Sequence, residues 1–187
     1  MGRGLPDAAG RLQQAAMQLF LEKGYEATTV AQIAERAGLT ERTFFRYFPD
    51  KREVLFSGSD LLIEAMRAAL AAAPAEASTS GQVAAALGAA ASVLTHREHA
   101  RLRQSLLDDH AELMERELIK MARLSGVLAE ALRARGAPEL TARVAAESGV
   151  AVFRVAFLRW VSSDRGTLQK HIDDVLAAQT RVWTSTA

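Results

Sequence analysis

The chain has 187 residues, and 49% of them are apolar, which is enough for a substantial hydrophobic core. Its net charge of +1 does not by itself indicate a nucleic-acid partner, because the first 56 residues hold eight Lys or Arg and seven Asp or Glu. The absence of cysteine excludes disulfides and thiolate metal sites. No apolar run reaches the roughly 18 residues of a membrane-spanning helix, and no signal peptide is recognisable. We therefore expect a cytoplasmic protein, and we expect it to have no cofactor.

Helical periodicity dominates the chain, and its first segment is an amphipathic helix that ends at Gly24. A short second helix follows, with one apolar face that consists of Val30, Ile33, Ala34 and Ala37. Gly38 supplies the backbone freedom that a helix C-terminus needs, and Thr40 is suited to cap the third helix. Two helices joined by a glycine-containing turn form the arrangement that places the second helix in a DNA major groove.

The remainder of the chain is predicted to be a larger helical body. In chain order we expect a linking helix over 50–73, a Ser/Thr-rich loop over 74–81, an Ala-rich helix over 82–95, a helix with a heptad-like stripe over 112–135, an almost wholly apolar helix over 141–163 and a striped helix over 168–184. The predicted fold is therefore all-α with about nine helices. It has an N-terminal three-helix helix-turn-helix domain over residues 1–48 and a helical regulatory and dimerisation domain over 49–187.

The N-terminal pattern resembles the TetR family of bacterial transcriptional regulators over about residues 10–56. The matching residues are Ala15-Ala16, Leu19-Phe20, Gly24-Tyr25, Thr28-Thr29-Val30, Ile33-Ala34, Ala37-Gly38-Leu39-Thr40, Thr43-Phe44-Phe45, Tyr47-Phe48 and Lys51. The resemblance implies a homodimer that binds a palindromic DNA operator, with repression as the commonest output. It also implies a small-molecule effector in the C-terminal body, whose binding moves the linking helix and separates the two DNA-reading domains.

Two positions depart from the family pattern. The family commonly has a tyrosine at the position of Phe45, and the hydroxyl of that tyrosine reaches a phosphate, a contact that Phe45 cannot make. Arg42 stands where many members carry a small residue, and a long cation there could reach base edges. These changes affect the detailed DNA contacts and leave the motif intact.

The residues that we expect to contact DNA are Thr29, Thr40, Arg42, Thr43, Phe45, Arg46, Tyr47 and Lys51. Thr29 and Thr40 stand at helix N-termini, where backbone N–H groups favour a phosphate. Arg42 and Arg46 are one turn apart and share a face, so either could contact guanine, a bidentate contact worth about 1–3 kcal/mol of discrimination. Thr43 could touch a thymine methyl or a phosphate, and Tyr47 and Lys51 could reach phosphates. Phe45 is a candidate contact with packing as its alternative.

Dimerisation and effector binding are assigned to the C-terminal body. A two-fold site with half-sites about 34–36 Å apart, or a multiple of this, requires two copies of the short reading helix. The helices over 141–163 and 168–184 are the candidates for a shared four-helix interface, with Val152, Val155 and Leu176 facing the partner. An apolar or aromatic effector could be lined by Met66, Leu106, His110, Met114, Met121, Phe153, Phe157 and Trp160, although such residues are also common in plain cores.

The sequence offers three other interpretations. A metal site at His96 and His99 is disfavoured by the charged surroundings of these residues. An enzyme is disfavoured because the sequence has no Gly-rich phosphate loop, no HExxH and no nucleophile elbow. A helical adaptor, or a ligand-binding protein that does not bind DNA, remains the alternative function, in which residues 30–48 serve only for packing.

Overall fold

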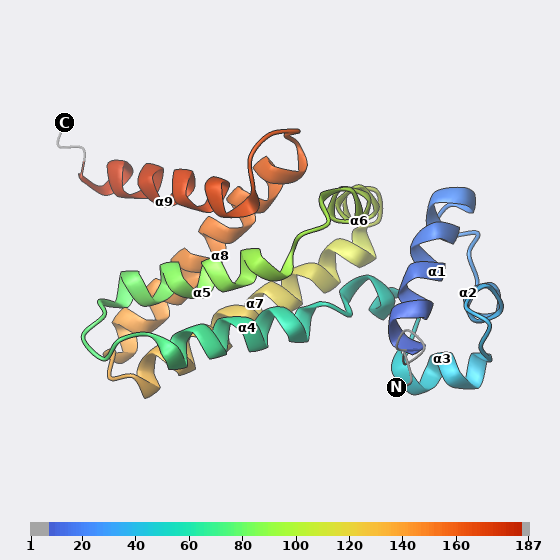
Figure 1. The fold of residues 1–187 in the computed structure, drawn as a ribbon, viewed down its shortest axis with the longest axis horizontal. Helices are drawn as coiled ribbons and strands as arrows, with labels where there is room; N and C mark the ends of the chain where they lie inside the picture. Colours follow the sequence, from blue (N-terminus) through green and yellow to red (C-terminus); the bar gives the residue numbers. More distant parts are fainter. Residues whose placement is uncertain (1–7, 185–187) are drawn as a thin grey trace, which may run out of the picture. The chain divides into compact units, whose positions relative to one another are not determined.

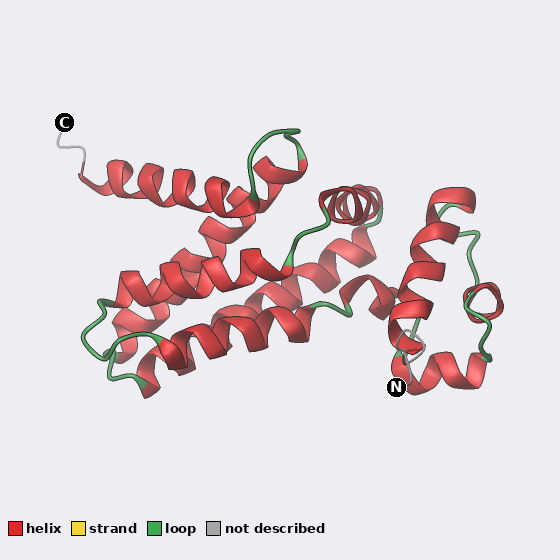
Figure 2. Ribbon diagram, in the orientation of Figure 1, coloured by secondary structure: helices red, strands yellow, loops and turns green. Residues whose placement is uncertain are grey.

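The computed structural model describes residues 8–184, apart from the side chain of Trp183. Within this range the chain forms nine α-helices and one 3-10 helix, and no strand is present (Figures 1 and 2). The helices are α1 (Ala8–Lys23), α2 (Val30–Arg36), α3 (Glu41–Tyr47), η1 (Arg52–Phe56), α4 (Ser59–Ala72), α5 (Thr79–Val93), α6 (Arg97–Asp109), α7 (Ala111–Ala134), α8 (Glu139–Val161) and α9 (Leu168–Thr184). The predicted all-α class with about nine helices is confirmed. None of the described helices has the length and apolar character needed to cross a membrane.

The chain divides into two compact units, and the division falls between Gly58 and Ser59. We predicted the boundary ten residues earlier, after residue 48, with one linking helix over 50–73. The structure instead has the short helix η1, a turn, and α4 beginning at Ser59. The prediction of a single helix over 50–73 was therefore wrong.

Local hydrogen bonds explain this interruption. The Asp50 carboxylate accepts hydrogen bonds from the backbone N–H groups of Arg52 and Glu53, at 2.8 and 3.1 Å, and so starts a tight turn. Three consecutive residues, Val54–Phe56, are then at most 4% exposed, and η1 packs against α1. Three successive buried side chains cannot share one narrow helical stripe, so this segment belongs to the core of the first unit.

The second unit is built around α8, which packs against α5, α6, α7 and α9, while α4 packs against α5 and α7 (Figure 1). Its core is rich in small residues, and α5 alone buries Ala86, Ala90 and Ala91. At Gly149 of α8 an added Cβ would lie 2.8 Å from Val83 Cγ1 of α5. The close approach of α5 and α8 therefore depends on the missing side chain at this position.

Candidate nucleic-acid interface

The first unit contains a helix-turn-helix whose ends are fixed by local hydrogen bonds. The Thr29 hydroxyl accepts a hydrogen bond from the Gln32 backbone N–H, and the Gln32 side chain accepts one from the Thr29 N–H, which together make a capping box for α2. At the other end of α2, Gly38 has a φ of 65°, and the Leu39 N–H donates to the Ala34 carbonyl at 2.8 Å. This left-handed C-terminal turn directs the chain into α3.

The reading helix α3 is anchored by one fully buried aromatic residue. Phe44 is 0% exposed, and its ring centroid lies 5.5 Å from that of Phe48, which is 5% exposed. Thr40 caps the helix by accepting a hydrogen bond from the Thr43 N–H at 3.2 Å. Because successive helical residues are rotated by about 100°, the face opposite Phe44 carries Arg42 and Arg46.

Five side chains of α3 are exposed: Glu41, Arg42, Phe45, Arg46 and Tyr47. We call the last four of these the reading face. Arg46 is held against its neighbour, since its Nη2 donates to the Tyr47 hydroxyl at 3.3 Å and its guanidinium carbon lies 5.0 Å from the ring centroid. Phe45 is 53% exposed, so the packing alternative suggested for it from the sequence does not describe its position.

Lys51 lies outside the reading face. Its ammonium group donates to the backbone carbonyls of Tyr25 and Thr28, at 2.7 and 3.1 Å, and sits 4.0 Å from the Tyr25 ring centroid. These contacts tie the segment before η1 to the turn before α2. Lys51 therefore has a structural role in the first unit, which the sequence did not indicate.

Most other cations of the described part of the first unit are bound by protein acceptors. Arg11 donates to the Ala37 carbonyl, Arg52 pairs with Asp50 at 2.7 Å, and Arg36 pairs with Glu22 at 2.7 Å. The hydrogen bond from Arg36 lowers the pKa of the Glu22 carboxyl below its ordinary value. On the reading face, Arg42 is the cation whose side chain has no partner within residues 8–58.

Comparison with known proteins places this helix-turn-helix in a family. Residues 12–57 match the family model described as bacterial regulatory proteins, tetR family. The helix-turn-helix of this chain is therefore of the TetR type. Over 73 residues it is 45% identical to the HTH-type transcriptional regulator TcmR of Streptomyces glaucescens, a match that covers 39% of this chain and 32% of that protein. The matched segment thus spans about a third of the length of that relative.

Solved structures extend the similarity of the fold to the second unit. The transcriptional regulator FadR from Bacillus subtilis, in complex with stearoyl-CoA, superimposes with a TM-score of 0.61 at 24% identity, over 90% of this chain and 95% of that one. NalD, the secondary repressor of the MexAB-OprM multidrug efflux pump in Pseudomonas aeruginosa, gives a TM-score of 0.58 at 23% identity, over 93% and 94% of the two chains. At these identities the likeness establishes the fold alone.

The eight predicted effector-lining residues have different positions in the second unit. Met66, Phe153 and Trp160 lie in the main core of the second unit, and Met121 and Phe157 pack against it. The ring centroids of Phe153 and Phe157 are 6.1 Å apart, and those of Phe157 and Trp160 are 5.9 Å apart. The other three predicted residues, Leu106, His110 and Met114, lie outside this core.

A cavity that the sequence did not indicate lies between α5, α8 and α9. Its volume is about 460 Å³, and none of the eight predicted effector residues lines it. The lining residues are Thr79, Ser80, Val83, Leu140, Thr141, Val144, Ala145, Ser148, Gly149, Leu176 and Gln179. No local sequence signal marks it, because it arises where three helices cross.

The three predicted dimer residues have different environments. Val152 is 3% exposed and packs inside its own protomer, so its assignment to a partner-facing surface was wrong. Val155 is 49% exposed, and Leu176 is half-buried and lines the cavity.

The exposed apolar residues of α8 lie on one side of the helix. At about 100° per residue, they fall within an arc of about 60° around the helix axis. We call this set the α8 stripe: Leu140, Val144, Ala151, Val155 and Leu158.

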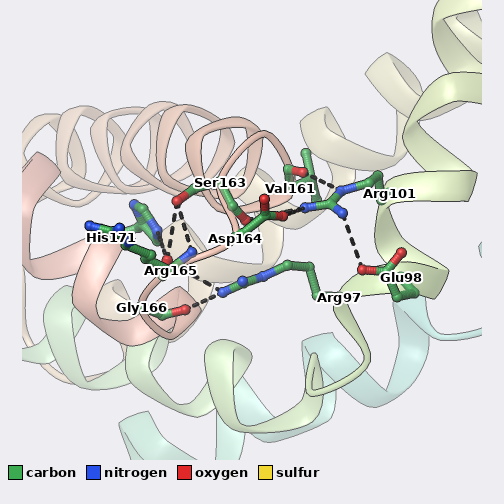
Figure 3. A network of polar contacts seen from close by, with 9 residues as sticks. All are labelled: Arg97, Glu98, Arg101, Val161, Ser163, Asp164, Arg165, Gly166 and His171. Carbon is green, nitrogen blue, oxygen red and sulfur yellow. Dashed lines mark hydrogen bonds and ion pairs between the residues drawn. The ribbon is translucent and has the colours of Figure 1, made fainter.

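Two arginines of α6 hold the loop between α8 and α9 (Figure 3). Arg101 donates from Nε to the Val161 carbonyl at 2.7 Å and from Nη2 to Asp164 at 2.9 Å. Arg97 donates to the Gly166 carbonyl, and its guanidinium carbon lies 5.3 Å from the Trp160 ring centroid. This network fixes the connection between the two C-terminal helices.

The histidines near the start of α6 have a positively charged environment. Partial desolvation, followed by the nearby charges of His96 and Arg103, lowers the pKa of the exposed His99. Within residues 8–184 no group of three or more His, Asp or Glu side chains is arranged to hold a metal ion.

Proposed function

We propose that the protein is a cytoplasmic transcriptional regulator, a repressor that binds a near-palindromic operator as a homodimer and is released by a small molecule. The observation that carries this proposal is the reading face. Four exposed side chains project from a helix that is anchored from behind by Phe44, inside a helix-turn-helix of the TetR type. A structural adaptor has no need for an unpartnered Arg42 and a half-exposed Phe45 on this helix.

The reading face suggests a division of labour among the DNA contacts. Arg42 is assigned to a base edge, because its side chain has no competing protein partner. Arg46 and Tyr47 form a joined donor pair that suits the phosphate backbone. Thr29 is assigned to a phosphate through hydroxyl donation, because its oxygen accepts the capping hydrogen bond and its proton remains available. The Thr40 and Thr43 hydroxyls share one hydrogen bond at 3.0 Å, so the pair has one hydroxyl proton left to donate to a phosphate. Lys51 is assigned to positioning the turn before α2 in place of its predicted phosphate contact.

The α8 stripe is the proposed centre of the dimer interface. An apolar row on a helix at the surface of a monomer is covered in a dimer, and two such helices with their neighbouring α9 helices form a four-helix arrangement. Val155 and Leu176 keep their assignment to this interface, and Leu140, Val144, Ala151 and Leu158 are added to it. Val182 on α9, which is 71% exposed, extends the apolar surface.

A small apolar molecule is the proposed effector. The FadR proteins from Bacillus subtilis and Thermus thermophilus were solved with stearoyl-CoA and lauroyl-CoA. In this chain an apolar core with adaptable Met66 and Met121, bordered by the stacked rings of Phe153 and Phe157, is suited to open around an apolar ligand. We keep Met66, Met121, Phe153, Phe157 and Trp160 as the candidate lining of that site. Leu106, His110 and Met114 are kept as a proposed extension of it outside this core.

Selection of duplexes from a random library tests the proposed function. The wild-type chain is expected to enrich a two-fold-symmetric site, and Arg42→Ala is expected to lose the preference at one position of each half-site. The loss should correspond to about 1–3 kcal/mol of discrimination, as for one bidentate arginine–guanine contact. Sequencing of the bound pools reads both results. If no sequence is enriched by the wild-type chain, the protein is an adaptor or binds another ligand.

A further inference from the structure

Phe45 is an aromatic side chain on the reading face that packing does not account for. It is 53% exposed, whereas its neighbour Phe44 is fully buried. The two rings meet edge to face, with centroids 5.5 Å apart and planes at 82°. Phe44 therefore supports one side of the Phe45 ring and leaves the rest of it in solvent.

The position of Phe45 on α3 places it beside the proposed base-reading arginine. At about 100° per residue, Phe45 lies about 60° around the helix axis from Arg42 and about 100° from Arg46. Tyr47 lies on the opposite flank, about 160° away from Phe45. When α3 lies in a DNA major groove with Arg42 directed at the bases, Phe45 therefore also lies in that groove.

The chemistry of the ring restricts what it can recognise. A phenylalanine has no donor or acceptor, so a phosphate oxygen offers it no hydrogen bond. Among the base edges of the major groove, the C5-methyl group of thymine is the apolar feature, and burying it against a ring removes apolar surface from water on both sides. Within residues 8–58, Arg11, Arg36 and Arg52 are held by protein acceptors, so an apolar contact with a base would add to the binding supplied by the arginines of the reading face.

We propose that Phe45 reads a thymine by contacting its methyl group, next to the base read by Arg42, and so sets the operator preference at one position of each half-site. This inference rests on the proposed DNA-binding function and deepens it. In place of the phosphate contact that a tyrosine hydroxyl makes, the chain gains a contact that depends on base sequence.

Single thymine-to-deoxyuridine substitutions in the selected duplex test the inference without altering the protein. Deoxyuridine pairs like thymine but lacks the methyl group. At one thymine of each half-site the loss of the methyl is expected to weaken wild-type binding about four-fold, the factor that corresponds to about 0.8 kcal/mol for one buried carbon. Fluorescence anisotropy with labelled duplexes measures the affinities.

Variants at position 45, measured with the thymine and deoxyuridine duplexes, make up a double-mutant cycle that tests whether Phe45 contacts the methyl group. Phe45→Ala should bind the thymine and deoxyuridine duplexes equally, whereas Phe45→Leu, which keeps an apolar side chain, should retain part of the difference. Leu21→Ala is the matched control, because Leu21 is an apolar residue of α1 that is 67% exposed, and it should leave the four-fold effect unchanged.

The outcomes separate this inference from the function on which it rests. Sequence-specific binding that is insensitive to every thymine methyl overturns the role of Phe45 and leaves the proposed function standing. A methyl effect that persists in Phe45→Ala also overturns it. Failure of the wild-type chain to bind any duplex overturns both.

Discussion

Phe44→Ala is expected to unfold the first unit and to abolish operator binding. Phe44 is 0% exposed and contacts both Phe45 and Phe48, so its removal leaves a cavity behind the reading helix. Such a substitution costs about 3–5 kcal/mol. Because a unit of this size has a total stability of about 3–9 kcal/mol, the loss removes most of it. Thermal unfolding followed by circular dichroism, together with duplex binding, measures both effects.

Phe45→Ala provides the control within the same helix. It removes the same kind of side chain from the adjacent position, but from an exposed site, so we expect a change in unfolding free energy below about 1 kcal/mol. Its effect should appear in base preference and not in folding. Unchanged thermal unfolding and operator binding in Phe44→Ala would show that α3 is not anchored as described.

Val144→Glu combined with Val155→Glu is expected to convert the dimer into monomers. Both valines are exposed in the protomer, at 56% and 49%, so carboxylates there do not disturb its core. In the dimer the same carboxylates would be buried without partners, and this desolvation cost opposes association. Loss of the second reading helix should weaken operator binding by about 10²- to 10⁴-fold. Light scattering and anisotropy measure the two quantities.

Leu118→Glu is the matched control for this pair. Leu118 is 49% exposed, lies on α7 and is not part of the α8 stripe. It should leave the dimer and its operator affinity unchanged. A dimer that survives both substitutions on α8 would place the interface elsewhere.

The helix-turn-helix could be predicted from the sequence because its signals are local. The capping of α2 by Thr29, the positive φ at Gly38 and the capping of α3 by Thr40 each depend on residues within one turn. The apolar spacing from Val30 to Ala37 supplied the remaining information. By contrast, the burial of Val54–Phe56 depends on contact with α1, which a helical pattern beginning at Asp50 does not reveal.

The surfaces of α8 could not be predicted in the same way. When a helix is apolar on nearly all sides, its sequence pattern does not indicate which side is buried. Periodicity alone therefore does not distinguish buried Val152 from exposed Val155. The cavity near Gly149 also depends on how α5 and α8 cross, which is a tertiary property. The hydrogen bonds of Lys51 to backbone carbonyls could not be predicted from the sequence either. Their acceptors are 23 and 26 residues away in the chain.

The salt dependence of duplex binding tests most directly whether α3 binds DNA. The dissociation constant should be measured over a series of salt concentrations, with the selected duplex and with a scrambled one. We expect log K to fall linearly with log salt, with a slope steeper than about −3, for the release of counterions by the arginines of two reading faces. The selected duplex should bind at least about 10³-fold more tightly than the scrambled one. A flat salt profile with equal affinity for both duplexes would contradict the assignment.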